Sequence, residues 1–167
     1  MTITQGEFAA SDHPDCVIST ILGSCVSTCL WDPDRRVGGM NHVLVARSES
    51  GPTRSDAAGV NAMELLINAL VRLGGDRRNL RAKVFGGAKM ISGLSDIGHL
   101  NGLFMLEFLE SEGIPCLGQS LGGTSARQIR FFPAEGRALL KSVTQAAVAP
   151  VPTKPAETDA GNGVELF

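Results

Sequence analysis

Apolar residues in the first half of the chain form short runs separated by polar turn residues. The runs over 17–22 and 26–31 predict two strands joined by a turn at Gly23-Ser24-Cys25. The run over 37–46 is apolar on both faces, as in a strand covered on both sides. From Ser55 or Asp56 to about Leu73, apolar residues recur at helical spacing, with Val60, Met63, Ile67, Leu70 and Val71 in the stripe.

The second half repeats this mixture of elements. A strand over 80–85 runs into Gly86-Gly87, and a helix begins with Asn101 as its cap. Further strands are expected over 114–117, 128–132 and 137–143, the last two joined as a hairpin by Pro133-Ala134-Glu135-Gly136. Two helices among about eight short strands favour an α+β layered domain.

The ends of the domain follow from composition. Residues 47–54 are polar and predict a surface loop, and from about residue 146 alanine, proline and threonine dominate. We therefore predict a folded domain over 1–146 and a disordered tail over 147–167, whose apolar end could dock in a partner's groove.

Charge and composition narrow the function classes. The chain has 167 residues, is 43% hydrophobic, which suffices for one core, and carries a net charge of −2. Without a run of basic residues, binding to nucleic acid is not expected. No apolar segment approaches the ~18 residues needed to cross a bilayer, and no secretory leader is evident. A cytoplasmic protein with four reduced cysteines is expected.

Cys25 and His42 are the candidate reactive pair. A histidine near a thiol can stabilise the thiolate beside an imidazolium, so the pKa of Cys25 is expected to be lowered. Gly23-Ser24 permits a tight turn that leaves N–H groups uncovered near the sulfur, where an oxyanion would form. Ser19 or Thr20 could hold the imidazole, but neighbours on a strand face opposite sides, so only one can reach it.

Structural interpretations of these residues stay open. A cysteine in an apolar run is often a small core residue, and a histidine on a strand is often structural. Cys25, Cys29 and His42 lack a fourth metal ligand, so a metal site is not expected. No cofactor is predicted.

Five blocks in order resemble the CheD family of chemoreceptor glutamine deamidases. They are Leu22-Gly23-Ser24-Cys25-Val26, Gly38-Gly39-Met40-Asn41-His42, Lys83-Val84-Phe85-Gly86-Gly87-Ala88, Ile97-Gly98 with Asn101, and Gly122-Gly123 with Arg127. The resemblance implies hydrolysis of glutamine side chains on methyl-accepting chemotaxis receptors by Cys25 and His42. It also implies face-to-face β-sheets with the helices on one side, similar to cytotoxic necrotizing factor catalytic domains.

The resemblance extends to further residues and partners. The family's threonine position falls on Ser19, which we therefore favour over Thr20 as the third catalytic residue. Candidate substrate-binding residues are Phe85, Gly86, Gly87, Asn101 and Arg127. A CheC-type phosphatase is a possible partner. A non-catalytic chemotaxis binding module and a peptidase, whose Cys-His chemistry would be the same, remain alternatives.

Overall fold

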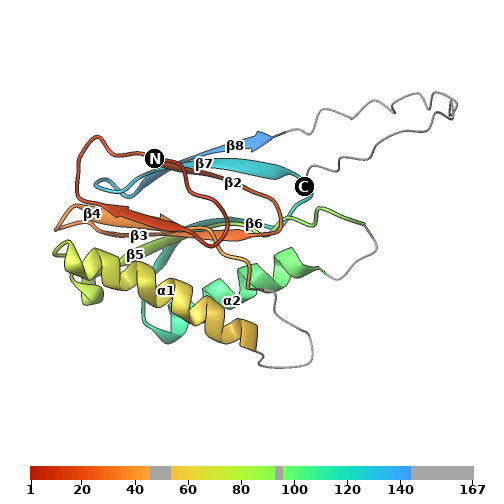
Figure 1. Cartoon of the computed structure of the whole chain (residues 1–167), viewed down its shortest axis with the longest axis horizontal. Helices are drawn as coiled ribbons and strands as arrows, with labels where there is room; N and C mark the ends of the chain where they lie inside the picture. The colour runs from red at the N-terminus through yellow and green to blue at the C-terminus, as the bar shows by residue number, and fades with distance from the viewer. Residues whose placement is uncertain (46–53, 93–95, 144–167) are drawn as a thin grey trace, which may run out of the picture.

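The computed structural model describes residues 1–45, 54–92 and 96–143, and these form three layers (Figure 1). The helices α1 (Arg54–Arg72) and α2 (Ile97–Ser111) cover one face of a five-stranded sheet. That sheet has the order β1 (Phe8–Ser11), β4 (Val37–Asn41), β3 (Val26–Asp32), β5 (Arg81–Gly86) and β6 (Cys116–Leu121). A three-stranded sheet of β2 (Ile18–Leu22), β7 (Ala126–Phe132) and β8 (Arg137–Val143) covers its other face.

The strand pairing follows from how the elements are connected. All named strand pairs are antiparallel except β5 and β6, which α2 joins as a crossover. A 3₁₀ turn, η1 (Arg77–Asn79), leads into β5. The predicted α+β architecture, with two packed sheets and both helices on one side, is confirmed.

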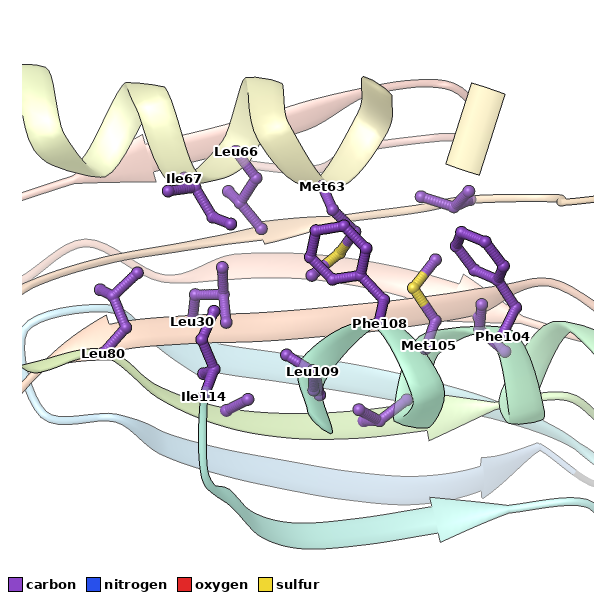
Figure 2. Close-up of a cluster of buried hydrophobic side chains, with 14 of the residues drawn as sticks. Leu30, Met63, Leu66, Ile67, Leu80, Phe104, Met105, Phe108, Leu109 and Ile114 are labelled. Carbon is purple, nitrogen blue, oxygen red and sulfur yellow. The ribbon is translucent and has the colours of Figure 1, made fainter. Parts of the chain in front are cut away.

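The larger core lies between the helices and the central sheet (Figure 2). Met63, Leu66 and Ile67 of α1 point toward the central sheet, and Phe108 of α2 extends into the same cluster, which includes Leu30 of β3. The apolar stripe predicted for α1 was partly wrong, because Val60 and Val71 are exposed and Leu66 takes their place in the core. Apolar spacing alone does not decide which of several neighbouring helix positions face the core, so the predicted buried face can differ from the observed one by one position around the helix.

A second core lies between the two sheets. Every residue of β3 is buried, because successive side chains alternate between the helix layer and the second sheet. Val26 and Leu30 belong to the helix-side core, whereas Cys25 and Cys29 pack in the inter-sheet core with Phe131 of β7. Cys25 therefore faces the space between the sheets.

Several elements differ from the sequence prediction, among them β6, which was expected over 114–117 and spans Cys116–Leu121. The edge strand β1 was not predicted, β4 ends at Asn41 although the apolar run continues to residue 46, and α2 begins at Ile97. Asp96 caps α2, its side chain accepting a hydrogen bond from the N–H of His99, so Asn101 is not a cap and lies inside the helix. In the described ranges, no helix is long and apolar enough to cross a membrane.

Two predicted segments lie outside the described residues. They are most of the loop over 47–54 and the whole of the tail over 147–167, together with the boundary at residue 146.

Candidate active site

The imidazole of His42 contacts a threonine hydroxyl from the other sheet. Thr20 Oγ1 of β2 lies 2.8 Å from His42 Nδ1, and both residues are buried. Ser19 faces away, and its hydroxyl contacts Thr2 Oγ1 and the Met1 carbonyl. Only one of the two hydroxyls contacts the imidazole, and it is that of Thr20 rather than that of Ser19, the residue favoured from the sequence.

The hydrogen bonds of Thr20 define which nitrogen of His42 carries the proton. Thr20 Oγ1 donates its single proton to the Ile3 carbonyl at 2.8 Å. The contact with His42 then requires Nδ1–H to donate to Oγ1, which assigns the tautomer from the hydrogen-bond network. Nε2 is left with its lone pair free, which is the form of a histidine that can accept a proton.

A hydrogen-bonded residue pair, Val26 and Val43, joins the chain segments that carry Cys25 and His42. Val26 and Val43 exchange main-chain hydrogen bonds of 2.9 and 2.8 Å, and their side chains face the helices. Cys25 and His42 each precede one member of this pair, so they project from the opposite face as diagonal neighbours. At such positions the Cα atoms are ~7–8 Å apart, within reach of longer side chains.

Burial controls the charge of both groups. Burial raises the pKa of the Cys25 thiol above its ordinary value of 9.0, and a hydrogen bond from its own main chain opposes this only partly. Burial also lowers the pKa of His42 below 6.5, against the nearby carboxylate of Glu7. Both directions are opposite to a thiolate-imidazolium pair, so they favour a neutral thiol and a neutral imidazole near pH 7 rather than the expected lowering of the thiol pKa.

The turn that carries Cys25 is held by all three of its carbonyl groups. The oxygens of Gly23, Ser24 and Cys25 accept hydrogen bonds from Ala88 N, Asn101 Nδ2 and Gly87 N, each at 2.9 Å. In a trans peptide the N–H points opposite to the C=O, so the N–H groups of Ser24 and Cys25 point away from these partners. Within the described ranges, neither N–H donates to another main-chain oxygen. They are suited to receive an oxyanion.

Gly86 and Gly87 pack directly against this turn. Both have positive φ, and a Cβ on Gly86 would overlap the Cys25 carbonyl oxygen. The absence of a side chain therefore lets the glycine pair lie close to the main chain of Cys25 and support the turn that carries it. Phe85, which precedes them, is buried in the inter-sheet core.

Asn101 and Arg127 are occupied by the protein itself. The fully buried Asn101 donates to Ser24 O and accepts from Val45 N at 3.0 Å. Arg127 of β7 donates to the carbonyl groups of Ser120 and Gly122 and is also buried. We therefore withdraw the expectation that Phe85, Asn101 and Arg127 bind substrate, because none presents a free group at an open surface.

The segment 4–8 completes the site and was missed by sequence reasoning. Cys25 Sγ donates to Gln5 Oε1 at 3.6 Å, and Gly6 N donates to His42 O at 2.8 Å. A cavity of about 230 Å³ beside His42 is lined by Gln5–Phe8, by residues 41–44 and by Ala58, Asn61, Ala62 and Leu65 of α1. Gly6 was the available signal, since glycine in a polar stretch marks a turn.

Comparison with known proteins identifies the family. The model of the CheD family, described as CheD chemotactic sensory transduction, matches residues 46–142. The probable chemoreceptor glutamine deamidase CheD of Rhizobium leguminosarum bv. trifolii is 47% identical, and the match covers 99% of this chain and 94% of that protein. The protein of that name from Caulobacter vibrioides is 49% identical, with 81% and 73% covered. This chain belongs to the CheD family.

Likeness to solved structures is weaker. The crystal structure of Bacillus licheniformis hypothetical protein YfiH gives a TM-score of 0.47 at 16% identity, covering 68% of this chain and 49% of that one. Nothing about function follows from it.

Proposed function

We propose that this chain hydrolyses glutamine side chains on methyl-accepting chemotaxis receptors to glutamate, with Cys25 as nucleophile, His42 as general base and Thr20 orienting the base. The contact between Thr20 and His42 carries the proposal, because it leaves Nε2 of a neutral imidazole free beside the Cys25 turn. Family membership and the names of the two relatives support the substrate.

The reaction follows in two halves. His42 takes the thiol proton as Sγ attacks the amide carbon, and the N–H groups of Ser24 and Cys25 stabilise the oxyanion. The protonated His42 donates to the leaving nitrogen, so ammonia departs and a thioester remains. Water then attacks the thioester carbon while His42 accepts its proton. Collapse breaks the carbon–sulfur bond and yields glutamate and the free thiol.

The test is incubation with the purified cytoplasmic domain of a receptor, followed by mass spectrometry of each glutamine. Wild-type protein converts specific glutamines to glutamate, and Cys25→Ala and His42→Ala each reduce the rate by at least about 10³-fold. Intact mass separates a deamidase from a peptidase, which would split the chain. Near-normal deamidation by either folded variant would refute the assignment.

The same variants distinguish an enzyme from a binding module. Under our proposal Cys25→Ala abolishes ammonia release while binding to receptors, and to a CheC-type phosphatase where one is present, is retained. Full biological activity of the Cys25→Ala protein would favour the non-catalytic alternative.

A further inference from the structure

The candidate active site already contains a glutamine side chain. Gln5 is exposed, and its carbonyl oxygen Oε1 lies 3.6 Å from Cys25 Sγ, accepting a hydrogen bond from the thiol. The amide carbon is bonded to this oxygen at ~1.23 Å and therefore lies close to the same sulfur. The side chain at the nucleophile is thus the chemical group that the proposed reaction consumes.

The main chain holds Gln5 in this place. Thr4 to Glu7 form a β-turn closed by a 3.0 Å bond from Glu7 N to Thr4 O, and Gly6 has the φ of +85° that the third residue of a type II turn requires. The Glu7 carboxylate closes the turn again, accepting from Thr4 N at 2.7 Å and from Thr4 Oγ1 at 2.9 Å.

The turn that carries Gln5 is also hydrogen-bonded to the main chain of His42, the proposed general base. Gly6 N donates to His42 O at 2.8 Å, and His42 N donates to Glu7 O at 2.9 Å. Gln5 therefore precedes a residue that is hydrogen-bonded to the main chain of His42. Groups held in contact within one chain react without the entropy cost of association, which favours attack on Gln5 over attack on a glutamine in solution.

We propose that Gln5 is a deamidation site of this chain, converted to glutamate in cis by Cys25 and His42. This inference rests on the proposed function. Sγ attacks Cδ of Gln5 while His42 accepts the thiol proton, and His42 returns that proton to the amide nitrogen, which leaves as ammonia. Water hydrolyses the thioester between Cys25 and residue 5. The balance is one water consumed, one ammonia released, and a carboxylate in place of the amide.

Exposure of Gln5 suits this chemistry. Because the side chain is exposed, water can reach the thioester from the solvent side. The product carboxylate stands beside the thiol. Its negative charge disfavours formation of the thiolate, so conversion also slows the enzyme.

The experiment is peptide mapping of full-length wild-type, Cys25→Ala and His42→Ala proteins by tandem mass spectrometry, after each is shown by circular dichroism to be folded. Gln119 of β6 is an exposed glutamine away from the site and serves as internal control. We expect glutamate at residue 5 and glutamine at residue 119 in the wild type, and glutamine at both in the variants. Tagged Cys25→Ala protein mixed with wild type keeps Gln5, since the reaction is in cis.

Parallel measurement on a receptor cytoplasmic domain separates the two proposals. If the wild type deamidates the receptor but keeps Gln5, self-deamidation is refuted and the proposed function stands. If it converts Gln5 but no receptor glutamine, self-deamidation stands and the receptor substrate is refuted. Conversion of neither refutes both, and equal conversion of Gln5 in wild type and Cys25→Ala shows spontaneous hydrolysis and refutes the inference.

Discussion

Thr20 and His42 contact each other across two different sheets, with Thr20 Oγ1 2.8 Å from His42 Nδ1. Thr20 belongs to the three-stranded sheet, and His42 follows β4 of the central sheet. The packing of the two sheets, through Ile18, Leu22 and Phe131, therefore sets the orientation of the imidazole. The packing of the core therefore affects the orientation of the proposed general base through the hydroxyl of Thr20.

The first prediction separates the two neighbouring hydroxyls. Thr20→Val keeps the shape of the side chain but removes the acceptor for Nδ1–H, a bond worth about 1 kcal/mol, so kcat/KM should fall about fivefold. Ser19→Ala removes an outward hydroxyl and should leave kcat/KM unchanged. Ammonia release with a receptor cytoplasmic domain measures both. An impaired Ser19→Ala beside an unimpaired Thr20→Val would reverse the assignment.

Alternation along β2 explains why sequence could not choose between them. Apolar residues occupy both faces of the strand, with Ile18 and Leu22 on the face of Thr20 and Ile21 on the face of Ser19. Only the docking of the second sheet decides which face is buried, and Ile21 is left exposed. The apolar runs next to Cys25 and around His42, in contrast, could be recognised as strands because strand periodicity is local.

Partners distant in the chain explain the other misses. Asn101 Nδ2 bonds to Ser24 O across 77 positions, and Arg127 takes main-chain carbonyls as acceptors. Main-chain groups leave no signature in the residue types, so a buried polar residue in a family block cannot be told from a substrate-binding one. The helix and hairpin were predictable because glycine, proline and apolar spacing act locally.

The second prediction concerns pH. Because burial lowers the pKa of His42 below 6.5, the imidazole gains a proton only in more acidic solution, where it can no longer accept the thiol proton. Activity should therefore be flat near neutral pH and decrease as pH falls below 6.5. The measurement is kcat/KM for the receptor domain against pH.

Alkylation of the free protein checks the state of the thiol. The raised pKa of Cys25 keeps its thiol protonated at neutral pH, so iodoacetamide should modify Cys25 more slowly than the exposed Cys116. The rate at which Cys25 is labelled should increase above pH 9.0. Faster labelling of Cys25 at pH 7 would instead show a thiolate-imidazolium pair at rest.

The third prediction concerns support of the nucleophile turn by Asn101. Asn101→Leu has a similar volume but leaves Ser24 O and Val45 N without partners, which should lower the free energy of unfolding by about 1–3 kcal/mol. Activity of the folded variant should fall too, since the turn loses one of its three carbonyl bonds. Urea unfolding and ammonia release measure these effects. Asn68→Leu, at an exposed position of α1, is the control.

The last prediction tests whether Gly86 is required because a side chain would collide with the Cys25 turn, in addition to its positive φ. Gly86 and Gly74 have similar positive φ, +111° and +96°, but a Cβ on Gly74 meets no atom within 4 Å. Gly74→Ala should therefore cost only the strain of a left-handed alanine, about 1–2 kcal/mol. Gly86→Ala should cost more and also displace the Cys25 carbonyl, so that kcat/KM falls in the folded variant while Gly74→Ala keeps full activity. Equal losses of stability with unchanged activity in both variants would show that the turn carrying Cys25 does not depend on the close approach of Gly86.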